Sequence, residues 1–183
     1  MSSRRDQILT TAAAMFAERG FHGVSVADLG AACGVSGPAL YRHFASKDAM
    51  LAEMLVDISE RLLAEGRRRR AESEQPDAAL QALIGWHIEF ALEHRDLIVV
   101  QDRDWAALPA EAREQVRSLQ RRYVEVWVDV LAEVRPDWGR RTARAAAHAT
   151  FGLLNSTPHS ALVGRSAMTD LLAEMAHQAL TPR

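Results

Sequence analysis

Hydrophobic residues recur along most of this chain at intervals of three and four positions, which is the spacing of one face of an α-helix. The first such run covers about residues 4–19 and ends at Gly20. Polar stretches that contain Gly or Pro separate the runs, and the clearest of them covers residues 72–77. The sequence lacks the turn pairs that join β-hairpins. The pattern therefore predicts an all-α protein of about nine helices.

The predicted helices divide between a short N-terminal region and a longer C-terminal one. They cover about residues 4–19, two short stretches between 24 and 47, and then 46–70, 77–93, 97–105, 109–135, 142–154 and 166–180. We expect the domain boundary to follow the second short helix. Residues 1–47 then form one domain, and residues 48–183 form the other.

The two short helices flank a turn that contains glycine. Ser25 can cap the first helix, with Asp28 as its reciprocal partner three residues later, and Gly34 can end it in a left-handed conformation. Ser36 can cap the second helix, and Pro38 falls in its first turn, where the missing N–H is not needed. This order and spacing are typical of a helix-turn-helix, whose second helix enters the major groove of DNA.

Composition and charge agree with a DNA-binding protein of the cytoplasm. The chain has 183 residues, of which 48% are hydrophobic and 6% aromatic, and its net charge is −2. Residues 1–47 carry +2 and the remainder −4, which suits a protein that places one end on phosphates. We expect no membrane span and no signal peptide. Cys33, the only cysteine, excludes an internal disulfide and is interpreted as a small buried hydrophobe.

The motifs of common enzymes are missing. There is no Gly-x-Ser-x-Gly, no phosphate-binding loop and no His-Glu-x-x-His. The seven histidines are scattered, and His87 and His94 are too far apart on one helix to share a metal. We therefore expect a protein that is not an enzyme and that holds neither a metal nor a cofactor. A DNA-binding protein without any effector remains an alternative.

Residues 4–51 resemble the N-terminal DNA-binding domain of tetracycline-repressor-type (TetR) transcriptional regulators. The matching residues include Ile8, Leu9, Ala12, Ala13, Phe16, Gly20, Ser25, Val26, Leu29, Gly34, Val35, Leu40, Tyr41, His43, Phe44 and Lys47. The resemblance implies an all-helical homodimer. Three N-terminal helices would bind DNA, and the remaining helices would form a ligand-binding and dimerisation domain.

The resemblance and the residue types together indicate which side chains meet DNA. We expect phosphate contacts from Ser25, Tyr41 and Lys47, and base contacts from Ser36, Gly37, Ala39 and Arg42. Lys47 is the only lysine, and it begins a helix, where the macrodipole already places positive charge. A phosphate at that helix end would remove the conflict. A solvated lysine is the alternative.

Aromatic and polar residues on the middle helices are candidates for an effector pocket. They are Trp86, His87, Phe90, Trp105, Arg122, Tyr123, Trp127, Phe151 and Asn155. A plain hydrophobic core is the alternative for each aromatic residue. His87 and Asn155 are the better polar candidates, because a buried polar side chain needs a partner.

The two C-terminal helices are candidates for a dimer interface, because a small domain cannot cover both of their apolar faces. The interface residues that we predict are Ala146, Leu171, Leu172 and Met175. An intramolecular core is the alternative.

Together these features predict a cytoplasmic, homodimeric TetR-type regulator. We expect a repressor that a small ligand releases from a palindromic operator. An acyl-coenzyme A would place its phosphates near Arg121 and Arg122, whereas a neutral hydrophobic effector of the multidrug type would need only the aromatic residues. The sequence does not name the effector, the operator or the regulated genes.

Overall fold

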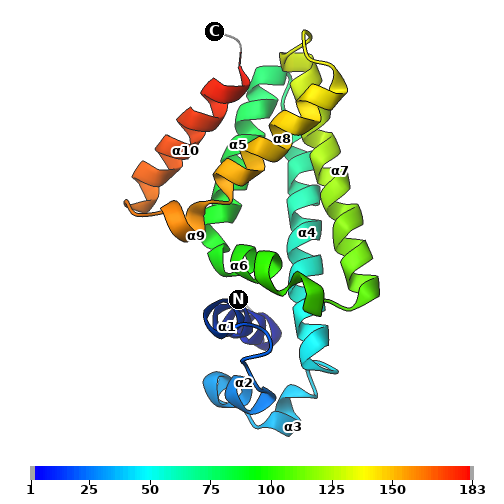
Figure 1. The fold of residues 1–183 in the computed structure, drawn as a ribbon, viewed down its shortest axis with the longest axis vertical. Coiled ribbons are helices and arrows are strands. Elements are labelled where there is room, and N and C mark those ends of the chain that lie inside the picture. Colours follow the sequence, from blue (N-terminus) through cyan, green and yellow to red (C-terminus); the bar gives the residue numbers. More distant parts are fainter. Residues whose placement is uncertain (1–2, 182–183) are drawn as a thin grey trace. The chain divides into compact units, whose positions relative to one another are not determined.

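The computed structural model describes residues 3–181, and within this range the chain is helical without β-strands (Figure 1). The helices are α1 (Arg4–Arg19), α2 (Val26–Cys33), α3 (Gly37–Leu40), α4 (Lys47–Glu72), α5 (Pro76–Glu93), α6 (Arg95–Asp104), α7 (Ala110–Val134), α8 (Arg140–Leu154), α9 (Thr157–Ser160) and α10 (Arg165–Leu180). A 3₁₀ turn at Trp105–Ala107 follows α6. The all-α prediction is confirmed. The sequence pattern missed only α9, a single turn that is too short to show a periodicity.

The predicted ends of the first helices are present in the structure. The Ser25 hydroxyl accepts from the Asp28 backbone N–H at 3.1 Å, and Asp28 in turn accepts from the Ser25 backbone N–H at 2.9 Å. Gly34 ends α2 at φ 64°, in the left-handed region that glycine adopts at little cost. The Ser36 hydroxyl caps α3 by accepting from the Ala39 N–H at 3.3 Å. Helix α3 itself is only four residues long.

By packing, the chain separates into two compact units. The first contains the residues up to Ile58 together with Asp96–Val116, and the second contains Ser59–Arg95 and the residues from Arg117 onward. Helices α4 and α7 therefore contribute to both units. The predicted boundary after residue 47 divides the DNA-binding region from the effector-binding region. It stays a prediction, because the compact units are defined by packing and not by function.

The first unit has a core of its own. Its centre is formed by α1, α2 and the start of α4, with Phe16, Leu29 and Leu51 fully buried. Arg103 of α6 joins this unit by donating hydrogen bonds to the carbonyl oxygens of Phe16 and Ala17 at the end of α1. The Phe16 carbonyl also accepts from the Gly20 N–H at 2.8 Å, so the guanidinium adds to the capping of the α1 C-terminus.

The second unit is built from α5, α7, α8 and α10. Helix α10 packs against α5 and α8 (Figure 1). Buried alanines Ala143 and Ala147, one turn apart on α8, allow close approach of that helix to its neighbours. Among the helices of the described chain, none combines the length and the apolar character that crossing a membrane requires.

Candidate DNA-binding and effector sites

The turn between α2 and α3 is shaped by two glycines. A Cβ atom at Gly30 would lie 2.8 Å from the carbonyl oxygen of Val35, so only glycine lets the turn fold back directly onto α2. Gly34 supplies the left-handed residue between the helices. This turn fixes α3 on α2 and leaves one side of α3 open to a ligand.

The residues that were predicted to read bases lie on and after α3. Ser36 and Arg42 are exposed, while Gly37 and Ala39 are half-buried. Tyr41 is 55% exposed, so most of its ring faces solvent and is not packed below the helix. Ser36 lies at the N-terminus of α3, and Tyr41 and Arg42 follow its C-terminus, so exposed polar side chains flank both ends of this short helix.

The two capping serines differ in what they can offer to a phosphate. Ser25 donates its hydroxyl proton to the Asp28 carboxylate at 2.6 Å, and these hydrogen bonds lower the pKa of the Asp28 carboxyl. The hydroxyl of Ser25 therefore has no proton left for a phosphate, and a charged carboxylate lies beside it. Ser36 has no such carboxylate partner among residues 3–181. Of the two serine hydroxyls, only that of Ser36 is available to donate.

Lys47 has partners inside the protein. Its Nζ donates to the carbonyl oxygens of Phe21 at 2.7 Å and Val24 at 2.8 Å, and it lies 4.2 Å from the centroid of the Phe21 ring. The ammonium therefore contacts carbonyl oxygens, which carry negative partial charge, in the loop between α1 and α2. These contacts offset the conflict with the helix dipole without a phosphate, and the DNA contact of Lys47 stays a prediction.

Two arginines near the N-terminus also bond within the first unit. Arg4 donates to the carbonyl oxygen of Cys33, and Arg5 donates to the Glu53 carboxylate and lies 4.2 Å from the centroid of the Phe44 ring. The Arg5–Glu53 pair could not be predicted from the sequence, because its members are 48 residues apart. These contacts hold α1 against α2 and α4.

An aromatic cluster surrounds His87 in the second unit. The imidazole stacks on Phe151 with ring centroids 4.8 Å apart, and its centroid is 5.8 Å from that of Tyr123. Phe90 and Trp127 approach it edge-on at 5.5 and 6.1 Å. Five of the residues that were proposed for the effector pocket thus come together, from three different helices.

Hydrogen bonds link the polar groups of this cluster into a chain. His87 Nδ1 lies 3.3 Å from the Tyr123 hydroxyl, and Nε2 lies 3.0 Å from Asn155 Oδ1. Burial lowers the pKa of His87 to about 4, partly opposed by the hydrogen bond to Asn155, so the ring is neutral at pH 7. Burial also raises the pKa of Tyr123. The consistent assignment has Tyr123 donating to Nδ1 and Nε2–H donating to Asn155.

Tyr123 rests on the backbone of α4. A Cβ atom at Gly66 would lie 2.6 Å from Cε2 of the Tyr123 ring, and Gly66 itself is buried. Only glycine permits this approach, so the position of the ring and the position of this part of α4 depend on each other.

The two buried indole N–H groups of Trp86 and Trp127 differ in their surroundings. Nε1 of Trp86 has no hydrogen-bond partner among the described residues, whereas the fully buried indole of Trp127 interacts with the Tyr123 hydroxyl. An unpaired buried N–H is costly, and a ligand that accepts a hydrogen bond removes that cost.

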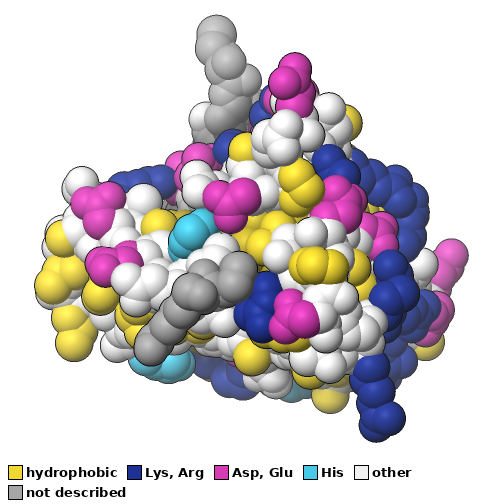
Figure 2. Space-filling model, turned by 90° about the horizontal axis from the view of Figure 1, so that it is seen from above, with side chains coloured by type: hydrophobic (Ala, Val, Ile, Leu, Met, Phe, Trp, Pro, Cys, Tyr) yellow, Lys and Arg dark blue, Asp and Glu magenta, His cyan; other side chains and the backbone are white. Residues whose placement is uncertain are grey.

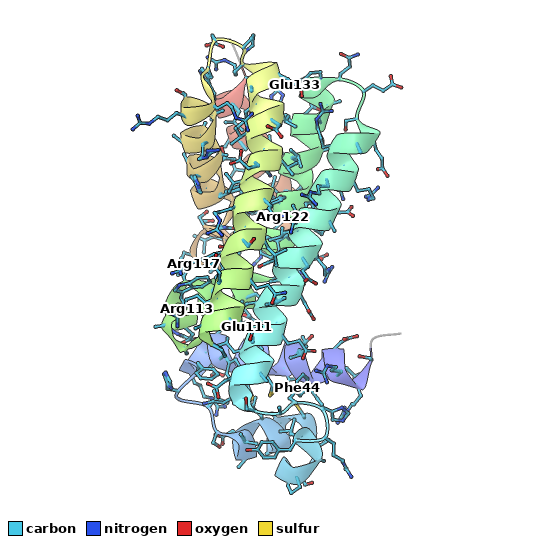
Figure 3. The ribbon with its side chains drawn as sticks, turned by 90° about the vertical axis from the view of Figure 1, so that its right-hand side faces the viewer. Phe44, Glu111, Arg113, Arg117, Arg122 and Glu133 are labelled. Carbon is cyan, nitrogen blue, oxygen red and sulfur yellow. The ribbon has the colours of Figure 1, made fainter. Side chains whose placement is uncertain are left out.

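The arginines that were predicted near the pocket lie in two surface grooves instead. Arg122 lines a groove of about 750 Å³ between α4 and α7, with Arg67, Arg70 and Arg140. Figure 3 shows Arg122 and Glu133 on the side of α7 that faces α4. Arg121 lines a second groove of about 410 Å³ with Arg117 and Arg144. None of the clustered aromatic residues lines either groove, and Trp105 belongs to the other compact unit.

The predicted dimer residues differ in exposure. Leu171 and Met175 on α10 are 46% and 45% exposed, and Ala146 on α8 is half-buried. Leu172 is only 1% exposed, because it faces the core of its own subunit, so its assignment to the dimer interface was wrong. Leu162 and Val163, before α10, are 88% and 53% exposed. In Figure 2 hydrophobic side chains gather at the left, where α10 lies in Figure 1, and Lys and Arg gather at the right.

In chain order, an exposed helix-turn-helix precedes a helical region that contains the aromatic cluster around His87. This combination is typical of DNA-binding regulators that also bind a small effector. Comparison with known families agrees with this class. Residues 8–54 match the bacterial regulatory proteins of the tetR family, and residues 73–159 match the tetracyclin repressor-like C-terminal domain. The chain belongs to the TetR family, whose members are regulators and not enzymes.

Individual relatives support the family at the level of sequence and structure. The chain is similar to the HTH-type transcriptional repressor KstR2 of Mycobacterium tuberculosis, with 33% identity over 132 residues, which is 72% of this chain and 66% of the relative. The matched region thus spans just under two thirds of that protein.

Two solved structures have the same fold. A TetR-family regulator from Bordetella parapertussis 12822 has 30% identity and a TM-score of 0.85, covering 96% of this chain and 95% of that one. The ketosteroid transcriptional regulator KstR2 of Mycobacterium tuberculosis has 25% identity and a TM-score of 0.84, covering 100% and 97%.

Proposed function

We propose that this chain is a homodimeric repressor that binds a palindromic operator and is released by a small effector. The observation that carries the proposal is the exposure of Ser36, Tyr41 and Arg42 on a helix-turn-helix whose turn is fixed by helix caps and two glycines. Arg42 is exposed and can form a forked pair with guanine, Ser36 can donate to a base edge, and Tyr41 can donate to a phosphate.

Dimerisation would bring two such surfaces to one operator. Leu171 and Met175 expose apolar area on one face of α10, and water-exposed leucine and methionine at one-turn spacing favour burial against a second copy. Ala145, Ala149 and Gly152 on α8 are also exposed, and such small residues allow two helices to approach closely. The two recognition helices would then occupy successive major grooves, about 34–36 Å apart.

The effector class follows from the chemistry of the His87 cluster. Its rings are apolar, its histidine is neutral, and its polar groups, which belong to His87, Tyr123 and Asn155, are uncharged hydrogen-bonding groups. Such a site favours an uncharged, largely apolar body that carries a hydrogen-bond acceptor such as a carbonyl group. The name of the KstR2 relative, a ketosteroid regulator, suggests a compound of this chemistry. An effector entering the cluster has to displace aromatic side chains, because these rings contact one another.

The contact between Tyr123 and Gly66 gives the effector a route to α4. Displacing the Tyr123 ring removes its support from the α4 backbone, and α4 runs without interruption from Glu72 to Lys47. A ligand that binds better to the shifted state weakens operator binding by the same factor.

An acyl-coenzyme A remains the second candidate. Its apolar chain would need the same cluster, and its phosphates would need one of the two arginine grooves. Arg122→Ala would weaken the response if the phosphates use the groove of Arg67 and Arg140, and Arg121→Ala would do so if they use the groove of Arg117 and Arg144. A neutral effector would be insensitive to both substitutions.

Selection from a library of random DNA duplexes tests the DNA-binding function. We expect enrichment of a sequence with two-fold symmetry, bound by the wild-type chain and not by Arg42→Ala. Absence of any enriched sequence would overturn the proposal.

Release of that duplex tests the effector class. Uncharged polycyclic ketones, the matching carboxylic acids and their coenzyme A thioesters should be compared at equal concentration. We expect the ketones to act and His87→Ala to abolish the response. If only the thioesters release the duplex, the neutral-effector hypothesis is wrong and an acyl-coenzyme A is the effector.

A further inference from the structure

We propose that the groove of about 750 Å³ between α4 and α7 is a second ligand site, in which Arg67 and Arg122 bind a phosphate-bearing anion that opposes the effector. The site is separate from the His87 cluster, because none of the clustered rings lines the groove. The opposition to the effector rests on the function proposed above, whereas the binding of the anion does not.

The groove is built from one side of each helix. On α4 its lining residues are Arg67, Arg70 and Ala71, which are three and four positions apart. On α7 the same spacing joins Arg122, Val126, Asp129 and Glu133. Figure 3 shows Arg122 and Glu133 on the side of α7 that faces α4. The groove therefore presents charged side chains from both helices to one space.

Two arginines of the groove already have carboxylate partners. Arg70 donates to both oxygens of Glu133, at 2.7 and 2.9 Å. Arg140 donates to Asp129 at 2.8 Å and to Glu125 at 2.9 Å. These are the three carboxylates that line the groove. All of its acidic side chains are thus engaged by Arg70 and Arg140.

The other two arginines, Arg67 and Arg122, are exposed, and neither guanidinium forms an ion pair or a hydrogen bond within residues 3–181. A guanidinium presents parallel N–H groups that match two oxygens of a phosphate. Two such groups also match the two negative charges of a phosphate monoester better than the single charge of a carboxylate. This chemistry favours a phosphate group as the ligand.

The two arginines flank the closest approach of α4 to α7. Arg67 follows Gly66, and Arg122 precedes Tyr123, whose ring would lie 2.6 Å from a Cβ atom at Gly66. An anion bound to both arginines holds the helices together at this point, whereas an effector that displaces the Tyr123 ring moves them apart. By linkage, each ligand then weakens the binding of the other by the same factor.

Isothermal titration calorimetry with inorganic pyrophosphate tests the site without DNA or effector. We expect Arg122→Ala to weaken pyrophosphate binding about tenfold. Arg122→Lys keeps the charge without the planar fork, so its affinity should lie between those of the wild type and Arg122→Ala. Arg141→Ala removes an exposed arginine outside both grooves and should leave the affinity unchanged. Equal weakening by Arg122→Ala and Arg141→Ala, or no binding to the wild type, would overturn the site.

Titration with free coenzyme A identifies the source of the phosphate. Binding of pyrophosphate that depends on Arg122, with or without binding of coenzyme A, supports a separate anion site. If coenzyme A binds through Arg122 and pyrophosphate does not bind, the groove belongs to the charged end of the effector, and the separate site is wrong.

Release of the selected duplex tests the opposition between the two ligands. The compound that releases the duplex should be titrated in phosphate-free buffer, with and without saturating pyrophosphate, at constant ionic strength. We expect pyrophosphate to raise the concentration needed for half-release about fivefold in the wild type and to have no effect in Arg122→Ala. An unchanged or lower concentration in the wild type would overturn the opposing role. If the wild-type chain binds no DNA, the proposed function is wrong, and calorimetry still decides the anion site.

Discussion

The candidate DNA-binding surface and the His87 cluster differ in where their polar side chains find partners. In the unit of α1–α3, the caps of Ser25 and Ser36 bond to groups three residues away, and the residues proposed to bind DNA stay exposed. In the other unit, His87 bonds to Tyr123 and Asn155, which are 36 and 68 residues distant; His87 and Tyr123 are buried, and Asn155 is half-buried. The first surface is therefore open to a large partner at all times. The His87 cluster can bind a small effector only if its aromatic side chains move apart.

Breaking the dimer should have the largest effect. Leu171→Glu together with Met175→Glu places two charges on the exposed face of α10, and we expect monomers whose affinity for the selected operator falls about 10³-fold, toward non-specific binding. Sedimentation and operator titration measure this. Gln178→Glu, on the same helix and also exposed, is the matched control. A variant that remains dimeric would move the interface elsewhere.

Leu171 and Leu172, which are adjacent on α10, allow a core position to be compared with a predicted interface position. Leu172→Ala should lower the free energy of unfolding by about 2–5 kcal/mol, because it empties a buried site. Leu171→Ala should cost less than about 0.5 kcal/mol in the monomer. Urea unfolding at low protein concentration provides the comparison. Equal losses would show that both residues lie in one core.

The Tyr123 contact on α4 should respond to a single methyl group. Gly66→Ala is expected to destabilise the protein by about 1–3 kcal/mol and to weaken operator binding, since the new Cβ would meet Tyr123 at 2.6 Å. Gly85→Ala in α5 has open space and should be neutral or gain up to about 1 kcal/mol. Thermal unfolding of the pair checks this. If Gly66→Ala changes neither stability nor operator binding, the proposed link between Tyr123 and α4 is wrong.

His87 should make the second unit sensitive to acid. Its pKa is about 4 in the folded protein, against about 6.5 in an unfolded chain, so the unfolded state binds more protons between these values. The free energy of unfolding should fall by about 2 kcal/mol from pH 7 to pH 5 through this group alone. His87→Gln should lose that part of the pH dependence, and His159→Gln, which is exposed, should keep it. Identical curves for all three proteins would contradict a buried neutral histidine.

Much of the fold could be predicted because its signals are local. Ser25, Asp28 and Gly34 form a cap and a turn within ten residues, and hydrophobic spacing marks each long helix. The partners of Lys47 and Arg5 could not be predicted, since each lies more than 20 residues away and no periodicity encodes it. Leu171 and Leu172 show a related limit. Both belong to one apolar stripe, and only the packing of α10 on α5 decides which of them faces inward.

The spacing of operator half-sites tests the central claim most directly. The affinity of the wild-type chain should be measured for the selected duplex and for one with about five base pairs inserted between the half-sites, which rotates one half-site to the opposite side of the helix. A dimer with two fixed recognition helices predicts that the insertion reduces affinity to the non-specific level, and that a full-turn insertion of about ten base pairs does not restore it completely. Equal affinity for all three duplexes would contradict the account.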